Sequence, residues 1–155
     1  MTNADATLPD GMRLRPMRRD DYPAVMALWR EAEGVGLSDV DSEEAIGRYL
    51  DRNPEMSFVA EADGAIAGAA LCGQDGRRGY LHHMAVGNVW RRRGLGRALA
   101  ERCFQALRRE GFTKCHLFVH AGNQQALAFW RRLGWLDRTD IVMLSRTAKA
   151  KDPKD

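Results

Sequence analysis

The chain has few cysteines and no long apolar run. Its three cysteines stand far apart at positions 72, 103 and 115, and no C-x-x-C pair occurs. This spacing argues against a disulfide framework and a zinc knuckle, so we interpret the cysteines as small core residues. No apolar stretch approaches the roughly 20 residues of a membrane span. The first residues also lack the basic start and apolar stretch of a secretory signal. These absences predict a cytoplasmic protein.

The charge is unevenly distributed along a chain of ordinary composition. The 155 residues suffice for one domain, and 45% hydrophobic with 29% charged residues is typical of a folded, soluble protein. The net charge is only +3, but Arg91, Arg92, Arg93 and Arg97 crowd one junction. Residues 31–44, "EAEGVGLSDVDSEE", hold six acids and no base. This pattern suits a polyanion at one end and a cation at the other, although two solvated loops would look the same.

The hydrophobic periodicity predicts one α/β domain with a mixed sheet over residues 12–146, between disordered tails at 1–11 and 147–155. Asp20 or Asp21 can cap the first helix, and Asp41 with Glu44 resembles a capping box for the second. Asp63 and Gly64 mark a hairpin turn. The expected order is β-α-α-β-β-β-α-β-α-β, with strands in 12–17, 57–86 (three), 114–120 and 141–145, and helices in 20–33, 41–50, 95–110 and 123–135.

An arginine- and glycine-rich turn, "RRRGLGR", precedes the third expected helix. The first turn of a helix presents unpaired N–H groups and about half a positive charge, and both favour an anion. Gly94 and Gly96 let the backbone approach that anion closely, and arginines add charge-assisted hydrogen bonds. The turn is not a Walker-A loop, because it lacks the Lys-Ser/Thr pair that this motif requires. The dinucleotide fingerprint fails as well, because Leu99 stands where it needs a small residue.

Arg91-x-x-Gly94-x-Gly96, together with "NQQALAFWRRLGW" at 123–135, resembles two signatures of the GNAT superfamily of N-acetyltransferases. The resemblance covers nearly the whole expected domain. It implies acetyl-CoA as co-substrate, no metal, and fourth and fifth strands that splay apart around the pantetheine arm. The backbone N–H of Ala85 or Val86 would stabilise the oxyanion. The implied cofactor-binding residues are Met84, Ala85, Val86, Arg91, Arg92, Arg93, Gly94, Leu95, Gly96, Arg97, Asn123, Phe129 and Trp130.

A base must deprotonate the acceptor amine, and "YLHHMAV" offers two histidines. On a regular strand Tyr80 and His82 share one face and His83 takes the other, which argues against a shared metal. Tyr80 and His82 align with a histidine pair of the arylalkylamine branch of the resembled family. We therefore place His82 first as the base and His83 second, and a purely structural pair remains an alternative. Trp130 stands where many relatives carry a tyrosine general acid, so water or Tyr80 would have to protonate the thiolate.

The same resemblance places the acidic segment beside the acceptor. An acidic wall concentrates a cationic amine, and the candidate acceptor-binding residues are Trp29, Leu37, Asp39 and Asp41, although Trp29 also fits the core and Asp41 a helix cap. The expected function is N-acetylation of a small-molecule or peptide amine. A non-catalytic acyl-CoA-binding module is the alternative. An RNA-binding protein would need interleaved aromatic residues that are missing here. Homodimers are common in the resembled family, but the sequence shows no interface signature.

Overall fold

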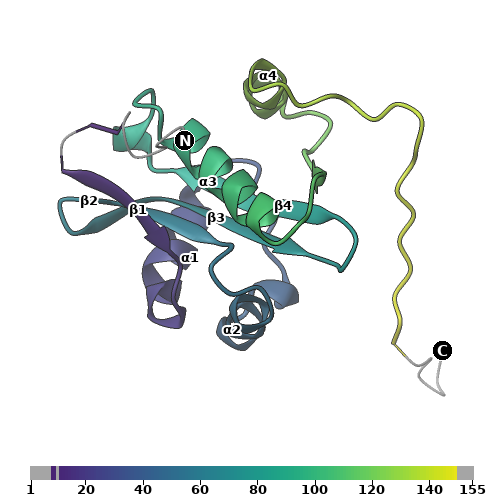
Figure 1. The fold of residues 1–155 in the computed structure, drawn as a ribbon, viewed down its shortest axis with the longest axis horizontal. Coiled ribbons are helices and arrows are strands. Elements are labelled where there is room, and N and C mark those ends of the chain that lie inside the picture. The colour runs from purple at the N-terminus through teal and green to yellow at the C-terminus, as the bar shows by residue number, and fades with distance from the viewer. Residues whose placement is uncertain (1–7, 10, 150–155) are drawn as a thin grey trace. The chain divides into compact units, whose positions relative to one another are not determined.

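The computed structural model describes residues 8–9 and 11–149, which divide into two compact units. The first unit ends at Asn123, and the second begins at Gln124. Figure 1 shows the elements. The expected tails lie mostly outside the described residues.

The first unit is built on a five-stranded sheet in the order β1-β2-β3-β4-β5. All neighbours are antiparallel except β4 and β5, which run parallel. Asp63 and Gly64 form the turn between β2 and β3, both with positive φ (50° and 80°), as a tight two-residue hairpin requires. The strands are β1 (Met12–Pro16), β2 (Phe58–Ala62), β3 (Ala65–Gln74), β4 (Gly79–Val86) and β5 (Cys115–Leu117).

Helices cover both faces of this sheet (Figure 1). α1 (Tyr22–Glu31) and α2 (Glu43–Arg52) lie on one face, and α3 (Leu95–Arg109) lies on the other. Two glycines show how closely they pack. A side chain at Gly79 would meet Leu107 of α3, whereas one at Gly73 would meet Tyr49 of α2. The mixed α/β fold class expected from the sequence is therefore confirmed.

Short 3-10 helices precede three of the α-helices: η2 (Arg19–Asp21), η3 (Asp39–Asp41) and η4 (Asn88–Trp90). The core on the α1 and α2 side centres on Trp29, which is fully buried with Val25 and Val59. The three cysteines are free, with Cys72 and Cys103 buried. The aliphatic stripe of α3 buries Leu95, Leu99 and Leu107 against the other face of the sheet.

Asp21 is the N-cap residue of α1, as predicted, but its side chain makes no capping bond to that helix, because its carboxylate is bound by Arg15 and by the backbone N–H of Arg18. The cap predicted for α2, Asp41, is wrong. The N-cap of α2 is Ser42, whose Oγ accepts the backbone N–H of Ala45 at 3.2 Å. Ser42 lies one residue closer to the helix than Asp41, and its hydroxyl binds the free N–H of the first turn. The carboxylate of Asp41 is therefore available to another partner.

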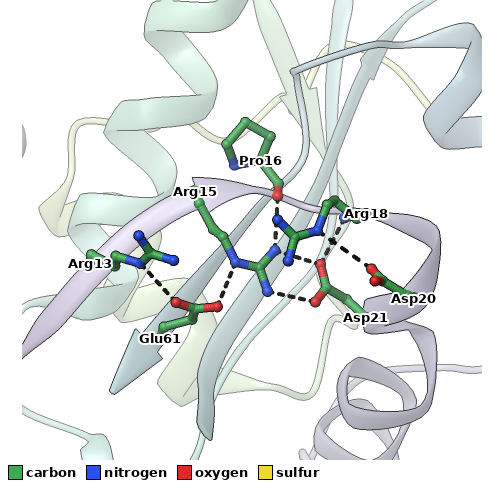
Figure 2. A network of polar contacts seen from close by, with 7 residues as sticks. All are labelled: Arg13, Arg15, Pro16, Arg18, Asp20, Asp21 and Glu61. Atoms are coloured by element: carbon green, nitrogen blue, oxygen red, sulfur yellow. Dashed lines mark hydrogen bonds and ion pairs between the residues drawn. The ribbon is translucent and has the colours of Figure 1, made fainter. Parts of the chain in front are cut away.

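A network of charged side chains joins β1, β2 and the start of α1 (Figure 2). Arg15 donates two hydrogen bonds to Asp21, at 2.6 and 2.8 Å, and one to Glu61 at 2.6 Å. Arg13 adds a contact to the second oxygen of Glu61 at 2.8 Å. Burial alone would raise the pKa of Asp21, but the bonds from Arg15 and from the backbone N–H of Arg18 lower it below its ordinary value.

The second unit contains α4 (Gln124–Arg132), on which Trp130 is buried. Its ring contacts Phe129 and Trp135 edge to face, at centroid distances of 5.0 and 5.3 Å. The final strand expected at 141–145 is wrong, because these residues form no strand and the side chains from Ile141 to Leu144 are exposed. An apolar run predicts a strand only where a partner edge accepts its backbone hydrogen bonds. The fifth strand is also shorter than expected.

Within the described residues, no helix combines the length and the apolar character needed to cross a membrane.

Candidate active site

A bulge in β4 turns both histidines toward the α1 and α2 side of the sheet. His82 pairs with Leu71 and Ala85 pairs with Ala69, so two residues of β4 oppose one residue of β3. His83 is one of the two, and its φ of +49° is unusual for a residue other than glycine. The expectation that His82 and His83 occupy opposite faces is therefore wrong, because the extra residue breaks the alternation of a regular strand.

His83 is held by a buried carboxylate. Its Nε2 lies 2.8 Å from Oδ1 of Asp41, whose side chain is 4% exposed. The other carboxylate oxygen accepts the backbone N–H of Ser38 at 3.0 Å, and the backbone oxygen of Asp41 accepts the hydroxyl of Tyr22 at 2.8 Å. The ring of Trp29 meets the imidazole edge to face at 5.2 Å. His83 itself keeps 20% of its side-chain surface exposed.

His82 lies among aromatic rings instead. Its imidazole stacks on Tyr80 and on Phe118, at centroid distances of 6.1 and 6.2 Å, and meets Tyr49 edge to face at 6.3 Å. Burial lowers the pKa of His82, and the neighbouring His83 lowers it further, against a weaker opposing effect of Asp41. These surroundings therefore disfavour the protonated form of His82.

The end of β4 has a free edge on the β5 side. The parallel pairing covers only three residue pairs and stops at Leu81 and Leu117. Beyond that point, Ala85 and Val86 pair with β3 and Met84 lies in the bulge, and no described strand pairs with these residues on the other side. A strand edge of this kind offers backbone N–H and C=O groups to an extended ligand. The expected splaying of the fourth and fifth strands is confirmed.

The loop after η4 leads into an open helix N-terminus. Arg92 and Gly94 have positive φ, 62° and 81°, so the chain coils tightly before α3. The first helical hydrogen bond runs from the N–H of Ala98 to the carbonyl of Gly94, at 3.0 Å. The earlier N–H groups at 95–97 therefore precede the helical ladder, as in an anion-binding turn. Nε of Arg91 approaches the carbonyl of Val86 at 3.5 Å, which links this loop to the free edge of β4.

Within the first unit, the acidic segment after α1 lies against the loop after β5. A Cβ placed on Gly34, in the acidic segment after α1, would lie 2.3 Å from Nδ2 of Asn123. The same segment approaches the loop after β5 at a second point, since a Cβ on Gly36 would lie 3.4 Å from Nε2 of His120. The acidic segment is thus in direct contact with the loop that carries Asn123.

The remaining candidate residues differ in their surroundings. Trp29 is fully buried beneath His83, and Leu37 packs on the core, whereas Asp39 is exposed. Phe129 and Trp130 belong to the second unit. The described residues contain no group of three His, Cys, Asp or Glu side chains that could hold a metal ion.

Sequence reasoning missed two contacts of the histidines. Phe118, which is 59% exposed, shares the ring stack of Tyr80 and His82. An aromatic residue near the end of the strand that pairs with β4 was the available signal. The contact between Asp41 and His83 joins residues 42 positions apart, and no local pattern predicts it.

Comparison with known proteins agrees with this geometry. The sequence pattern of the acetyltransferase (GNAT) family matches residues 22–135. An acetyltransferase of Pectobacterium atrosepticum is 32% identical over 135 residues, which cover 87% of this chain and 94% of that protein.

Two solved structures share the fold. The ribosomal-protein-S18-alanine N-acetyltransferase from Escherichia coli matches with a TM-score of 0.67 and 25% identity, over 83% of this chain and 79% of that one. The PaiA N-acetyltransferase from Thermoplasma acidophilum, solved in complex with coenzyme A, matches with a TM-score of 0.70 and 16% identity, over 79% of this chain and 87% of that one.

Proposed function

This chain belongs to the acetyltransferase (GNAT) family, and from that premise we propose that it transfers the acetyl group of acetyl-CoA to the nitrogen of a primary amine. One observation carries the proposal. The open first turn of α3 is joined to the free edge of β4 by η4 and by the contact of Arg91 with Val86, which supports a continuous site for an anion and an extended arm. An acyl-CoA has this composition, a pyrophosphate joined to an extended amide-containing arm.

The residues of the loop fit a pyrophosphate. Backbone N–H groups from Arg92 to Arg97 would bind its oxygens, and Gly94 and Gly96 leave room for them. Arg91 and Arg93 supply positive charge at the same turn. Met84, Ala85 and Val86 would pair with the pantetheine arm, with Asn123 beside it. A solved structure of similar fold contains coenzyme A, which supports coenzyme A as the ligand but does not assign these residues.

The acceptor would enter on the α1 and α2 side, where the two histidines lie. The acidic segment 31–44 forms part of this side and attracts a cationic amine. Asp39 is exposed there and is the segment's best candidate for direct contact with the acceptor. The amine is that of a small molecule or of a peptide. The E. coli relative, whose name specifies a protein alanine as its acceptor, favours a peptide N-terminus as the first probe.

The amine attacks as a neutral nucleophile, so its ammonium form must lose a proton to the protein or to water. The backbone N–H of Ala85 or Val86 would stabilise the oxyanion at the bulge. Trp130 cannot release a proton at working pH, so water or Tyr80 would protonate the departing thiolate. A thiolate with a pKa of about 8.5, like that of cysteine, also leaves tolerably without prior protonation.

Calorimetric binding of coenzyme A tests the loop assignment. Gly96→Glu puts a carboxylate against the pyrophosphate and should abolish measurable binding. Gln105→Glu makes the same charge change farther along α3 and should bind coenzyme A as the wild type does. Wild-type affinity in the Gly96 variant would refute the assignment.

Free-thiol release from acetyl-CoA separates the enzyme from a non-catalytic binding module. An enzyme releases coenzyme A only when a suitable amine is present. Tight binding of coenzyme A without release, for every amine tried, would favour the binding module.

A further inference from the structure

Asp41 and His83 form a pair that the acetyl-transfer function alone does not explain. The carboxylate is buried, accepts the N–H of Ser38, and uses its remaining oxygen for Nε2 of His83. Burying a carboxylate costs free energy unless it is well hydrogen-bonded, so the hydrogen bond to His83 helps to stabilise Asp41 inside the protein. Because an ionised carboxylate only accepts hydrogen bonds, Nε2 of His83 must be the donor. The lone pair of His83 is then on Nδ1.

The groups that face His83 differ in charge from those that face His82. Asp41 on η3 is the charged neighbour of His83, Trp29 on α1 is neutral, and His82 follows on β4 itself. His82 contacts the rings of Tyr49, Tyr80 and Phe118 and the imidazole of His83. A positive charge that forms on His83 is stabilised by an adjacent carboxylate. One that forms on His82 lies among uncharged rings and next to a second imidazole.

We infer that His83, rather than His82, receives the proton of the acceptor amine on Nδ1, and that Asp41 is the positioning residue that fixes the His83 tautomer and stabilises its imidazolium. This inference rests on the proposed acetyl transfer. It reverses the order expected from the sequence, in which His82 came first. It also changes the expected role of Asp41, which acts through His83 instead of contacting the acceptor.

The bulge gives this arrangement its geometry. The positive φ of His83 turns its side chain onto the acceptor side, next to the point where the β4 edge becomes free. Backbone strain in a residue other than glycine is found at functional sites more often than elsewhere. In the reaction the amine nitrogen forms a bond to the acetyl carbon as the C–S bond breaks. One proton passes from that nitrogen to His83, the thiolate takes one from water, and the imidazolium then gives its proton to the hydroxide left behind, so that His83 is neutral again.

The tautomer can be measured without an acceptor. Long-range ¹H–¹⁵N spectra of the labelled full-length protein distinguish a ring protonated on Nε2 from one protonated on Nδ1. The chain has four histidines, and the signal that disappears in His83→Asn identifies His83. We expect the Nε2–H form in the wild type and a mixture of tautomers in Asp41→Asn. An Nδ1–H form in the wild type would overturn the inference.

Kinetics with three variants test the role in transfer, with acetyl-CoA and a peptide that begins with alanine as the first acceptor, followed by spermidine and kanamycin. Asparagine tolerates positive φ and can still donate to Asp41, but it cannot take a proton. His83→Asn should therefore lower kcat about 100-fold near pH 7 while leaving coenzyme A affinity unchanged. Asp41→Asn should lower kcat about tenfold. The decrease in kcat should be smaller for His82→Asn than for His83→Asn.

Glu110→Gln serves as the control, because it removes an exposed carboxylate at the end of α3, outside the acidic segment and the loop before α3, and should leave kcat unchanged. If His82→Asn loses more than His83→Asn, or if His83→Asn keeps wild-type kcat, the inference is wrong although the protein is an acetyltransferase. If the wild type transfers acetyl to none of the three amines, the proposed function fails with these acceptors, and the inferred proton transfer falls with it. The tautomer measurement still decides whether Asp41 orients His83.

Discussion

Arg15 and Asp21 face each other in a two-bonded ion pair, with N–O distances of 2.6 and 2.8 Å and side chains only 12% and 8% exposed. The pair ties the first strand to the turn that starts α1. Through α1 it supports Trp29, on which His83 rests. A break at this distant point is therefore expected to weaken the site as well as the fold.

Asp21→Asn should lower the free energy of unfolding by about 2–4 kcal/mol at pH 7, because the largely buried guanidinium of Arg15 loses one of its two carboxylate partners and keeps only Glu61. The pKa of Asp21 is lower in the folded protein than in the unfolded chain. The stabilisation is thus fully present above the unfolded pKa of about 3.9 and is lost as the pH falls through the folded pKa. Urea unfolding at pH 7 and pH 3 should show the two proteins converging at low pH. An equal difference at both values would contradict the assignment.

Ser42→Ala should destabilise the protein by about 1 kcal/mol, since the N–H of Ala45 loses its capping oxygen. Ser42→Asp keeps a capping acceptor and should retain most of the stability. Thermal unfolding of both variants checks this. If Asp41 were the cap, Ser42→Ala would instead be neutral.

Gly34→Ala should destabilise the protein more than Gly64→Ala does. Both glycines have nearly the same positive φ, 82° and 80°, so the backbone penalty of alanine is matched. Only at Gly34 would the new methyl group meet another atom, Nδ2 of Asn123 at 2.3 Å. Unfolding midpoints measure the difference, and coenzyme A affinity should fall in Gly34→Ala alone. Equal effects at the two positions would show that the contact with Asn123 does not matter.

The titration of His82 should reveal its surroundings. Its pKa is lowered by burial and by His83 and is raised slightly by Asp41. NMR titration should therefore give a midpoint below the ordinary value of about 6.5. His83→Asn should move that midpoint up, and Asp41→Asn should move it down. Because the unfolded chain binds this proton more readily, the depressed pKa costs stability as the pH falls below about 6.5. A midpoint above 6.5 would contradict this arrangement.

Local patterns predicted most of the elements. The Asp63-Gly64 turn, the apolar stripe of α3 and the glycine-rich loop before it act over a few residues, so their structure can be derived from spacing alone. The prediction of Asp41 as the cap of α2 was wrong because spacing alone could not decide it. Local sequence permits Asp41 or Ser42 as the cap of α2, and only the tertiary contact to His83 decides between them.

The site was less accessible to sequence reasoning. One extra residue in β4 places His83 on the same side as His82, and alternation along a regular strand cannot reveal a bulge. The prediction of a final strand at 141–145 was wrong because the hydrogen bonds of a strand depend on a partner edge and not on its own residues. Phe118 entered the histidine cluster through the pairing of β4 with β5, which is likewise a property of the sheet.

The most direct test of acetyl transfer measures free-thiol release from acetyl-CoA with and without the alanine-starting peptide, spermidine or kanamycin, and identifies the product by mass spectrometry. We predict that at least one of these amines is acetylated on nitrogen and that release depends on its presence. Binding of coenzyme A with no acetylated product from any of them would contradict the proposed transfer.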